Sequence, residues 1–193
     1  MENNNIDIPS AEELYKEVKR VKGHADFAKL FYNTIASLIV VAAAAVLISM
    51  LFLPVLRVTG TSMTPTLDND QLVVCGKGGS FSQGDIVAFY YNNKILLKRV
   101  IAVSGDYVNI NPDGTVYVND KKLDEPYIKE KAFGECDIKL PYQVPEQRIF
   151  VMGDHRSTSI DSRSSTVGCI SEEAVVGKIV LRVWPLNEIG FIK

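Results

Sequence analysis

Ser62 is the first residue of the chain whose surroundings suggest chemistry. It lies in "TGTSMTPTL", residues 59–67, where Gly60 and Pro65 disfavour regular structure. A serine in such a turn often does no more than bond a local backbone group. As a nucleophile it would need a nearby base to take its proton. The sequence offers two kinds of base, a histidine and a lysine.

The histidine that could serve is His155, because His24 precedes a long apolar run and belongs on the other side of it. A lysine serves only when its amine is neutral, and at an ordinary pKa of about 10.4 the neutral fraction at pH 7 is on the order of one in 2,500. Burial can lower a lysine pKa by several units. Lys98, in "ILLKRVIAV" at 95–103, has the apolar surroundings that this requires. A charged lysine at a strand edge that reaches to water is the alternative.

A third segment, "MGDHRSTSIDSR" at 152–163, is dense in hydroxyl groups and in charges of alternating sign. By itself it is typical of a solvated loop with surface ion pairs, each of which contributes little. Because it follows the apolar run "RIFVM", it also suits a network that holds a catalytic group in place.

The elements that must position these residues are predicted to be strands. Runs such as "QLVVCG", "DIVAFYY", "RIFVMG" and "KIVLRVW" are rich in Val, Ile, Tyr and Phe and are bounded by turn residues. "NPDG" at 111–114 predicts a hairpin, and "SEEAVV" at 171–176 is the one helical hint. We expect residues 57–193 to form a mostly β, barrel-like domain, closed or nearly closed, with a hairpin-rich accessory region over 104–146.

Residues 30–56 are free of charge, and these 27 residues exceed the roughly 20 that a helix needs to cross a bilayer. A buried core helix and a cleaved signal peptide are the alternatives, but the latter has an apolar core of about 7–15 residues and a small-residue cleavage site. A retained transmembrane signal-anchor fits better. Ahead of it, Ser10 and Glu13 form a capping-box pattern that predicts a short polar helix to about Val21, and residues 1–9 are expected to be frayed.

The flanking charges predict the orientation of this span. Five basic residues precede it (Lys16, Lys19, Arg20, Lys22 and Lys29), whereas only Arg57 follows within fifteen residues. The positive-inside rule then places residues 1–29 in the cytoplasm and the domain on the outer face of the cell membrane, in a single-pass arrangement.

Composition argues against several other classes. The net charge of −2 gives no reason to expect a nucleic-acid partner. The three cysteines, Cys75, Cys136 and Cys169, fall in no metal-binding spacing, and their odd number leaves at least one unpaired. With two histidines in the chain, we expect no metal site and no cofactor.

Four motifs follow the N-terminal anchor in a fixed order: "SMTPTL" at 62–67, "GDIVAF" at 84–89, "KRVIAVSGDYV" at 98–108 and "GDHRSTSIDSR" at 153–163. Together they resemble those of the type I signal peptidases, membrane-bound serine proteases that remove signal peptides from exported proteins. The length and the single span resemble the short enzymes of Gram-positive bacteria. The resemblance also implies a mostly β catalytic core, which agrees with the strand prediction.

The resemblance implies a role for each residue at a motif position. Ser62 would be the nucleophile that forms an acyl-enzyme, neutral Lys98 the general base, and Ser159 a hydroxyl that helps to orient the lysine amine. Ion pairs of Arg99, Asp154, Arg156, Asp161 and Arg163 would support them. Shallow pockets that accept small substrate residues would be lined by Val58, Met63, Leu67 and Leu97. The implied partners are signal peptides of preproteins, the lipid bilayer and the secretion translocon.

The chain departs from the family pattern at two positions. His155 replaces an asparagine of the last motif, so a histidine base remains an alternative to Lys98. Gly60 stands where some members carry a serine that helps to bind the oxyanion, so we expect backbone N–H groups, including that of Ser62, to take this role. A binding-only relative would tolerate loss of Ser62 or Lys98, and both are present. A self-cleaving repressor would carry a DNA-binding head, and a histidine-based esterase a G-x-S-x-G elbow.

Overall fold

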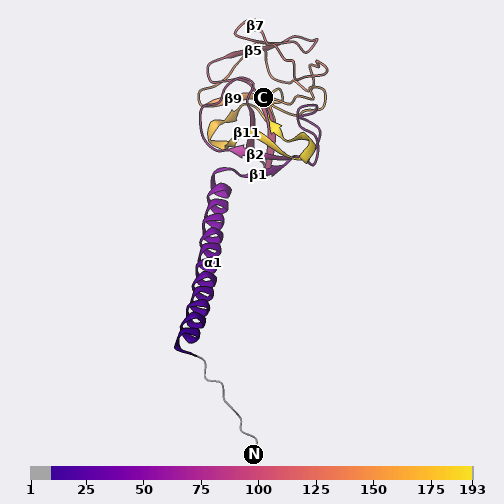
Figure 1. Ribbon diagram of the computed structural model, residues 1–193. Coiled ribbons are helices and arrows are strands. Elements are labelled where there is room, and N and C mark those ends of the chain that lie inside the picture. The colour runs from indigo at the N-terminus through magenta and orange to yellow at the C-terminus, as the bar shows by residue number, and fades with distance from the viewer. Residues whose placement is uncertain (1–9, 193) are drawn as a thin grey trace, which may run out of the picture. The chain divides into compact units, whose positions relative to one another are not determined.

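The structure, a computed structural model, describes residues 10–192 and divides the chain into two units, 1–49 and 50–193. The first described element is helix α1, Ala11–Phe52 (Figure 1). At its start, the backbone N–H of Glu13 donates to Ser10 Oγ, and the backbone N–H of Ser10 donates to the Glu13 carboxylate. The predicted capping box is therefore confirmed. The prediction for residues 1–9 lies outside the described residues.

Helix α1 does not end near Val21 as predicted but continues without a break to Phe52. Its polar first half contains no proline and carries ion pairs one turn apart, Glu12–Lys16 and Glu17–Arg20, which favour the helix. Residues Phe27–Ser49 within it, 23 residues of mean hydropathy 2.2 with exposed side chains, are a candidate membrane span by length and composition. The predicted span 30–56 runs too far, because Val55 and Leu56 belong to a strand.

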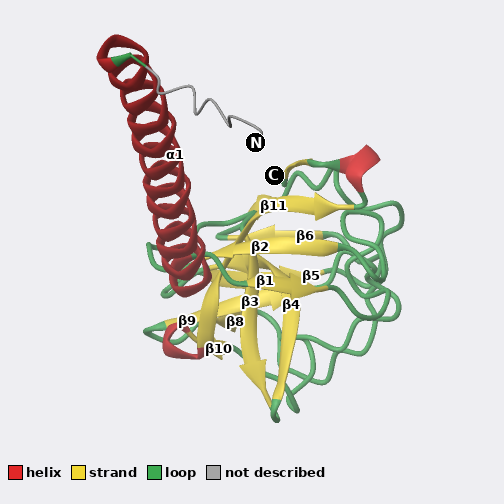
Figure 2. Cartoon of the chain, turned by 60° about the horizontal axis from the view of Figure 1, so that its bottom comes forward, coloured by secondary structure: helices red, strands yellow, loops and turns green. Residues whose placement is uncertain are grey.

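The second unit contains an eight-stranded antiparallel sheet, whose strands are coloured yellow in Figure 2. Its strand order is β1-β2-β11-β3-β4-β9-β10, and β12 pairs with β11. The strands are β1 Val55–Arg57, β2 Leu72–Gly76, β3 Ile86–Tyr91, β4 Lys94–Ala102, β9 Arg148–Met152, β10 Ile170–Ser171, β11 Val175–Trp184 and β12 Gly190–Phe191. The mostly β prediction is confirmed. The predicted closure into a barrel is not found among residues 10–192, because β1 and β10 end the order without pairing to each other.

A four-stranded sheet of order β7-β6-β5-β8 lies within residues 104–146. Its strands are β5 Tyr107–Ile110, β6 Val116–Val118, β7 Lys121–Lys122 and β8 Tyr142–Gln143. The predicted hairpin joins β5 to β6, where the backbone N–H of Asn111 donates to the carbonyl of Thr115. In Figure 1, β5 and β7 lie at the opposite end of this unit from β1 and β2. We call residues 104–146 the accessory region.

Two 3-10 turns complete the second unit. The first, η1 at Glu172–Ala174, lies within the segment 171–176 for which the sequence hinted at a helix. The second, η2 at Leu186–Glu188, precedes β12. Of the apolar side chains in the C-terminal segment, Ile192 packs against the core cluster that includes Val58 and Met63, whereas four others are exposed. They are Trp184, Leu186, Ile189 and Phe191, the last of which is 82% exposed.

Candidate active site

Lys98 and Ser62 come from different parts of the chain and meet side by side. Lys98 lies in β4, paired with Val87 of β3, and Ser62 lies in a turn in which the backbone N–H of Thr64 donates to the carbonyl of Thr61. The Nζ of Lys98 is 2.7 Å from the Oγ of Ser62. This distance allows a proton to pass directly between the two groups.

Lys98 is only 4% exposed, so it does not reach to water as the alternative interpretation of its strand would require. Along β4 the residues are exposed or half-buried up to Leu97 and buried from Lys98 onward. Burial lowers the pKa of the Lys98 amine, because an ammonium ion loses its hydration there. The Arg163 guanidinium acts in the same direction, while Asp161 and Asp154 oppose the shift in this pKa. The net direction favours the neutral amine that a base requires.

His155 lies near Ser62 but contacts its backbone. The backbone N–H of His155 donates to the Ser62 carbonyl at 3.1 Å. The ring Nδ1 of His155 lies 3.3 Å from Thr64 Oγ1. Among the contacts of the described residues, only Lys98 is bonded to the Ser62 hydroxyl. The geometry therefore favours lysine over histidine as the partner of this hydroxyl.

The charged residues of 153–163 are buried, so the alternative of a solvated loop with surface ion pairs is wrong. Arg99 of β4 donates to both carboxylate oxygens of Asp154, at 2.9 and 2.8 Å, and Arg163 donates to both oxygens of Asp161, each at 2.9 Å. All four side chains are at most 2% exposed. Further bonds satisfy the remaining donors and acceptors, as a buried ion pair requires. Arg163 also donates to the Phe133 carbonyl, and the backbone N–H of Gly153 to Asp161.

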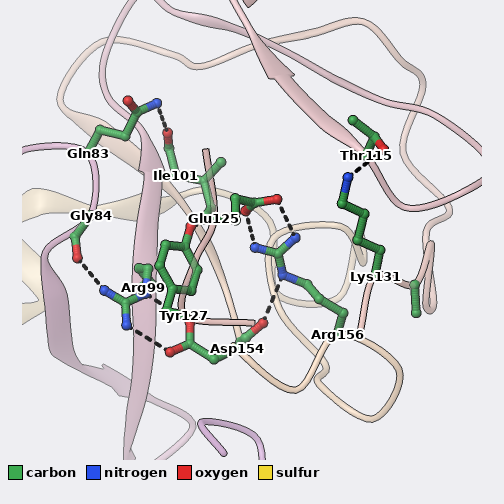
Figure 3. Close-up of polar contacts among 12 residues, drawn as sticks. Gln83, Gly84, Arg99, Ile101, Thr115, Glu125, Tyr127, Lys131, Asp154 and Arg156 are labelled. Atoms are coloured by element: carbon green, nitrogen blue, oxygen red, sulfur yellow. Dashed lines mark hydrogen bonds and ion pairs between the residues drawn. The ribbon is translucent and has the colours of Figure 1, made fainter. Parts of the chain in front are cut away.

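Two residues of this network, Glu125 and Tyr127, were not predicted from the sequence. Figure 3 shows the Glu125 carboxylate facing the guanidinium of Arg156 and the Tyr127 ring beside Arg99. Both come from the accessory region, about 30 positions away from Arg156 and Arg99. Their segment, "DEPY" at 124–127, reads as a polar turn in the sequence, so nothing local marks them as partners of buried arginines.

Ser159 is 2% exposed, and its Oγ has no hydrogen-bond partner among the described residues. No bond joins it to Lys98 in this part of the chain, so the orienting role stays a prediction. Its side chain packs directly against Gly153, at which an added Cβ would meet Ser159 and the carbonyl oxygen of Ser62. Ser159 and Gly153 are thus in close contact with the backbone of Ser62.

A cavity of about 280 Å³ opens beside the two side chains. Two stretches line it, residues 56–60 with Ser62 and Met63 on one side and residues 95–98 of β4 on the other. Of the predicted pocket residues, Val58, Met63 and Leu97 line this cavity. Leu67 is fully buried in the core cluster that includes Val58 and Met63, so it supports the wall from behind.

The half of β4 beside the cavity has one unpaired edge. Residues Lys94–Arg99 pair with β3, whereas β9 pairs with β4 only from Arg99 onward. Within the described part of the chain, no strand pairs with this edge of residues 95–97, which line the cavity, so their backbone N–H and C=O groups on that side can pair with a peptide. Among the described residues there is no cluster of three or more His, Cys, Asp or Glu side chains that could hold a metal ion.

Residues 31–184 match the family described as signal peptidase, peptidase S26. The chain belongs to this family. It is 39% identical over 173 residues to signal peptidase I of Bacillus licheniformis, covering 83% of this chain and 91% of that one. It is 33% identical over 166 residues to signal peptidase I U of Bacillus subtilis (strain 168), covering 80% and 88%.

A solved signal peptidase I from Enterococcus faecalis V583 is also similar, with 28% identity and a TM-score of 0.44, over 52% of this chain and 97% of that one. The family resemblance predicted from the four motifs is confirmed by the family match and the relatives. As a member of this peptidase family, the chain is an enzyme, a hydrolase of the serine peptidase type.

Proposed function

We propose that this enzyme is a membrane-anchored endopeptidase that removes N-terminal signal peptides from exported preproteins, with Ser62 as nucleophile and Lys98 as general base. The observation that carries the assignment of roles is the 2.7 Å approach of Lys98 Nζ to Ser62 Oγ, with the lysine only 4% exposed. A serine hydroxyl is a weak nucleophile unless a base takes its proton, and a desolvated amine beside it can act as this base near neutral pH.

The reaction proceeds in two steps. Neutral Lys98 takes the proton of Ser62 as Oγ attacks the scissile carbonyl carbon, and the resulting ammonium then gives that proton to the leaving amine. The free Lys98 amine next takes a proton from water, and the resulting hydroxide attacks the carbonyl carbon of the acyl-enzyme ester. When the tetrahedral intermediate collapses, the bond from this carbon to Ser62 Oγ breaks, the Lys98 ammonium gives its proton to Oγ, and the signal peptide leaves with a new C-terminal carboxyl group. Backbone N–H groups, including that of Ser62, bear the negative charge of each tetrahedral intermediate.

Gly60 bears on this oxyanion site. It lines the cavity next to Ser62, and a Cβ added to it would meet nothing within 4 Å, so the space beside it is open. Its φ of +89° is strained for other residues, which favours glycine over a serine here. Losing one side-chain donor costs enzymes that rely on it about 3–4 kcal/mol. The backbone donors therefore carry more of the stabilisation in this chain.

The substrate is bound as an extended strand. The unpaired edge of β4 at residues 95–97 and the stretch 56–60 face each other across the cavity, so a peptide between them can pair with the backbone. The cavity walls of Val58, Met63 and Leu97 are apolar and suit apolar side chains. We assign this cavity to the small residues at the first and third positions before the cut.

The membrane brings enzyme and substrate together. Helix α1 serves as the anchor through Phe27–Ser49, with its basic N-terminal flank in the cytoplasm and the catalytic unit outside. Only eight residues separate Leu53 from Ser62, which keeps the nucleophile close to the bilayer surface, where the cleavage site of a signal peptide emerges from the translocon. Confinement in one plane raises the effective concentration of substrate.

The test is cleavage of a signal-peptide substrate in detergent by the wild type, Ser62→Ala, Lys98→Ala and His155→Ala. We expect no product from Ser62→Ala or Lys98→Ala, whereas His155→Ala retains most of its rate because its ring lies on Thr64. An active Lys98→Ala together with an inactive His155→Ala would reverse the assignment of the base. A wild type that cuts nothing and forms no adduct with an acylating inhibitor would refute the proposed activity.

A further inference from the structure

We propose that Glu125 and Tyr127 are positioning residues for the Ser62–Lys98 pair. Glu125 binds Arg156, which fixes the backbone behind Ser62. Tyr127 contacts Arg99, which follows Lys98 in β4. We call residues 125–127 the clasp. The inference rests on the proposed function, since it concerns how the same two catalytic groups are kept together.

The first arm of the clasp leads to Ser62. The Glu125 carboxylate accepts hydrogen bonds from Nη1 and Nη2 of Arg156, and the two side chains are only 3% and 0% exposed. Nε of Arg156 donates to the carbonyl of Gly153 at 3.2 Å. Gly153 in turn packs against the Ser62 carbonyl, since a Cβ built on it would lie 2.5 Å from that oxygen. The position of Glu125 is therefore transmitted to Ser62 through three successive contacts, by way of Arg156 and Gly153.

The second arm leads to Lys98. The Tyr127 ring lies over the guanidinium of Arg99, with 3.9 Å from Cζ to the ring centroid (Figure 3). Asp154 holds the same guanidinium through both carboxylate oxygens. Tyr127 and Asp154 together fix the side chain of Arg99, and this also fixes the backbone of β4 next to Lys98. The Tyr127 hydroxyl donates to Glu125 at 3.0 Å, so the two arms are joined within the clasp itself.

The clasp does not take part in substrate binding. Neither of its side chains lines the 280 Å³ cavity, which is formed by residues 56–63 and 95–98. If Glu125 loses its charge, the buried guanidinium of Arg156 loses the carboxylate that it contacts directly and must move or draw in water. That movement releases Gly153 and lets the Ser62 backbone shift. The expected defect is consequently in the chemical step and not in substrate affinity.

The experiment uses the full chain in detergent, with Glu125→Gln and Tyr127→Leu as test variants. Tyr127→Phe keeps the ring over Arg99. Lys131→Met is the matched control. Lys131 donates to Thr115 Oγ1 at 3.1 Å in the same accessory region, and among the described residues it makes no hydrogen bond or ion pair with residues 153–163. Cleavage of a signal-peptide substrate gives kcat and KM, normalised to sites titrated with an acylating inhibitor.

We expect kcat to fall about ten- to a hundredfold in Glu125→Gln and Tyr127→Leu, since a misplacement on the order of 1 Å costs about a hundredfold. KM should stay within about twofold, as for interactions made only in the transition state. Tyr127→Phe and Lys131→Met should keep kcat near that of the wild type. Unchanged kcat in both test variants would overturn the inference. An equal loss in Lys131→Met would also overturn it, because the effect would then reflect general support by the accessory region.

Amide hydrogen exchange of residues 152–160 gives a second readout that needs no turnover. The clasp predicts faster exchange in Glu125→Gln than in the wild type, and no change in Lys131→Met. If the wild type proves unable to cleave signal peptides, the proposed function fails while the exchange result still decides the clasp. Equal exchange in the wild type and Glu125→Gln would refute the positioning role even where cleavage is normal.

Discussion

Gly153→Ala is expected to impair catalysis more than folding, because the new methyl group points at the backbone of the nucleophile. A Cβ on Gly153 would lie 2.5 Å from the Ser62 carbonyl oxygen and 2.5 Å from Ser159 Cβ, and it would collide with Ser159 Oγ. Real Cβ atoms essentially never come within 3.0 Å of such atoms. The Ser62 oxygen therefore has to move by about 0.5 Å, and the nucleophile moves with it.

The magnitude follows from this displacement. Overpacking a buried site costs about 1–3 kcal/mol of stability, and we expect Gly153→Ala to fall in that range. A misplacement of about 1 Å costs about a hundredfold in rate, so a shift of half that size should lower kcat by roughly tenfold. Chemical denaturation measures the first quantity, and cleavage of a signal-peptide substrate well below the melting temperature measures the second.

Two further variants separate the two clashes. Ser159→Gly in the Gly153→Ala background removes the collisions with Ser159 but leaves the one with Ser62, so stability should recover in part while kcat stays low. Gly76→Ala is the matched control, because a Cβ there meets only ordinary contacts, the nearest at 3.6 Å from Val180. Wild-type kcat in Gly153→Ala would refute the close packing behind Ser62 from which this prediction is derived.

Three other perturbations have definite expected outcomes. The pH profile of kcat/KM should have an acid limb below the ordinary pKa range of lysine, because activity appears as pH rises through the Lys98 pKa and burial lowers that pKa. An acid limb at or above pH 10 would contradict the neutral-amine assignment. Asp154→Ala leaves Arg99 buried without the carboxylate of Asp154 and should lower the free energy of unfolding by about 3–5 kcal/mol, measured by denaturant titration. A loss below about 1 kcal/mol would show that the ion pair is hydrated. Gly60→Ala should lower the free energy of unfolding by about 1–3 kcal/mol because alanine is strained at a φ of +89°, although the added Cβ meets open space. A melting temperature equal to that of the wild type would exclude this strain.

The burial of Lys98 could be anticipated from sequence because the signal for it is local, whereas its pairing with Ser62, 36 positions away, was implied only by the family resemblance. The apolar residues next to Lys98 in β4 indicate burial, and the structure bears out that the amine is enclosed. The capping box at Ser10 and the hairpin at 111–114 are confirmed for the same reason: each depends on residues within one turn of the chain. Local patterns of this kind are readable without knowing the fold.

The features that sequence reasoning missed depend on distant contacts or on ambiguous local signals. The buried state of Arg156 requires Glu125, which is 31 positions away in a polar stretch. The end of the span was placed too late because the residues of β1, Val55 and Leu56, are as apolar as the helix before them. Only Pro54 marks the change from helix to strand. Barrel closure was overpredicted because strand composition does not specify which edges pair.

The missing closure and the buried lysine have a common origin in β4. A general base must be desolvated to be neutral, yet it must also be reachable by the substrate, and these requirements conflict within a uniform sheet. In β4 the two requirements are met on opposite sides of Lys98. From Arg99 onward β9 pairs with the edge of the strand, whereas before Lys98 no strand among the described residues pairs with that edge. In the proposed function, a peptide that pairs with residues 95–97 would fill the open half and bring its scissile carbonyl to Lys98 and Ser62. Such a peptide would also cover the 4% of Lys98 that remains exposed, which would further favour the neutral amine on which the proposed attack depends.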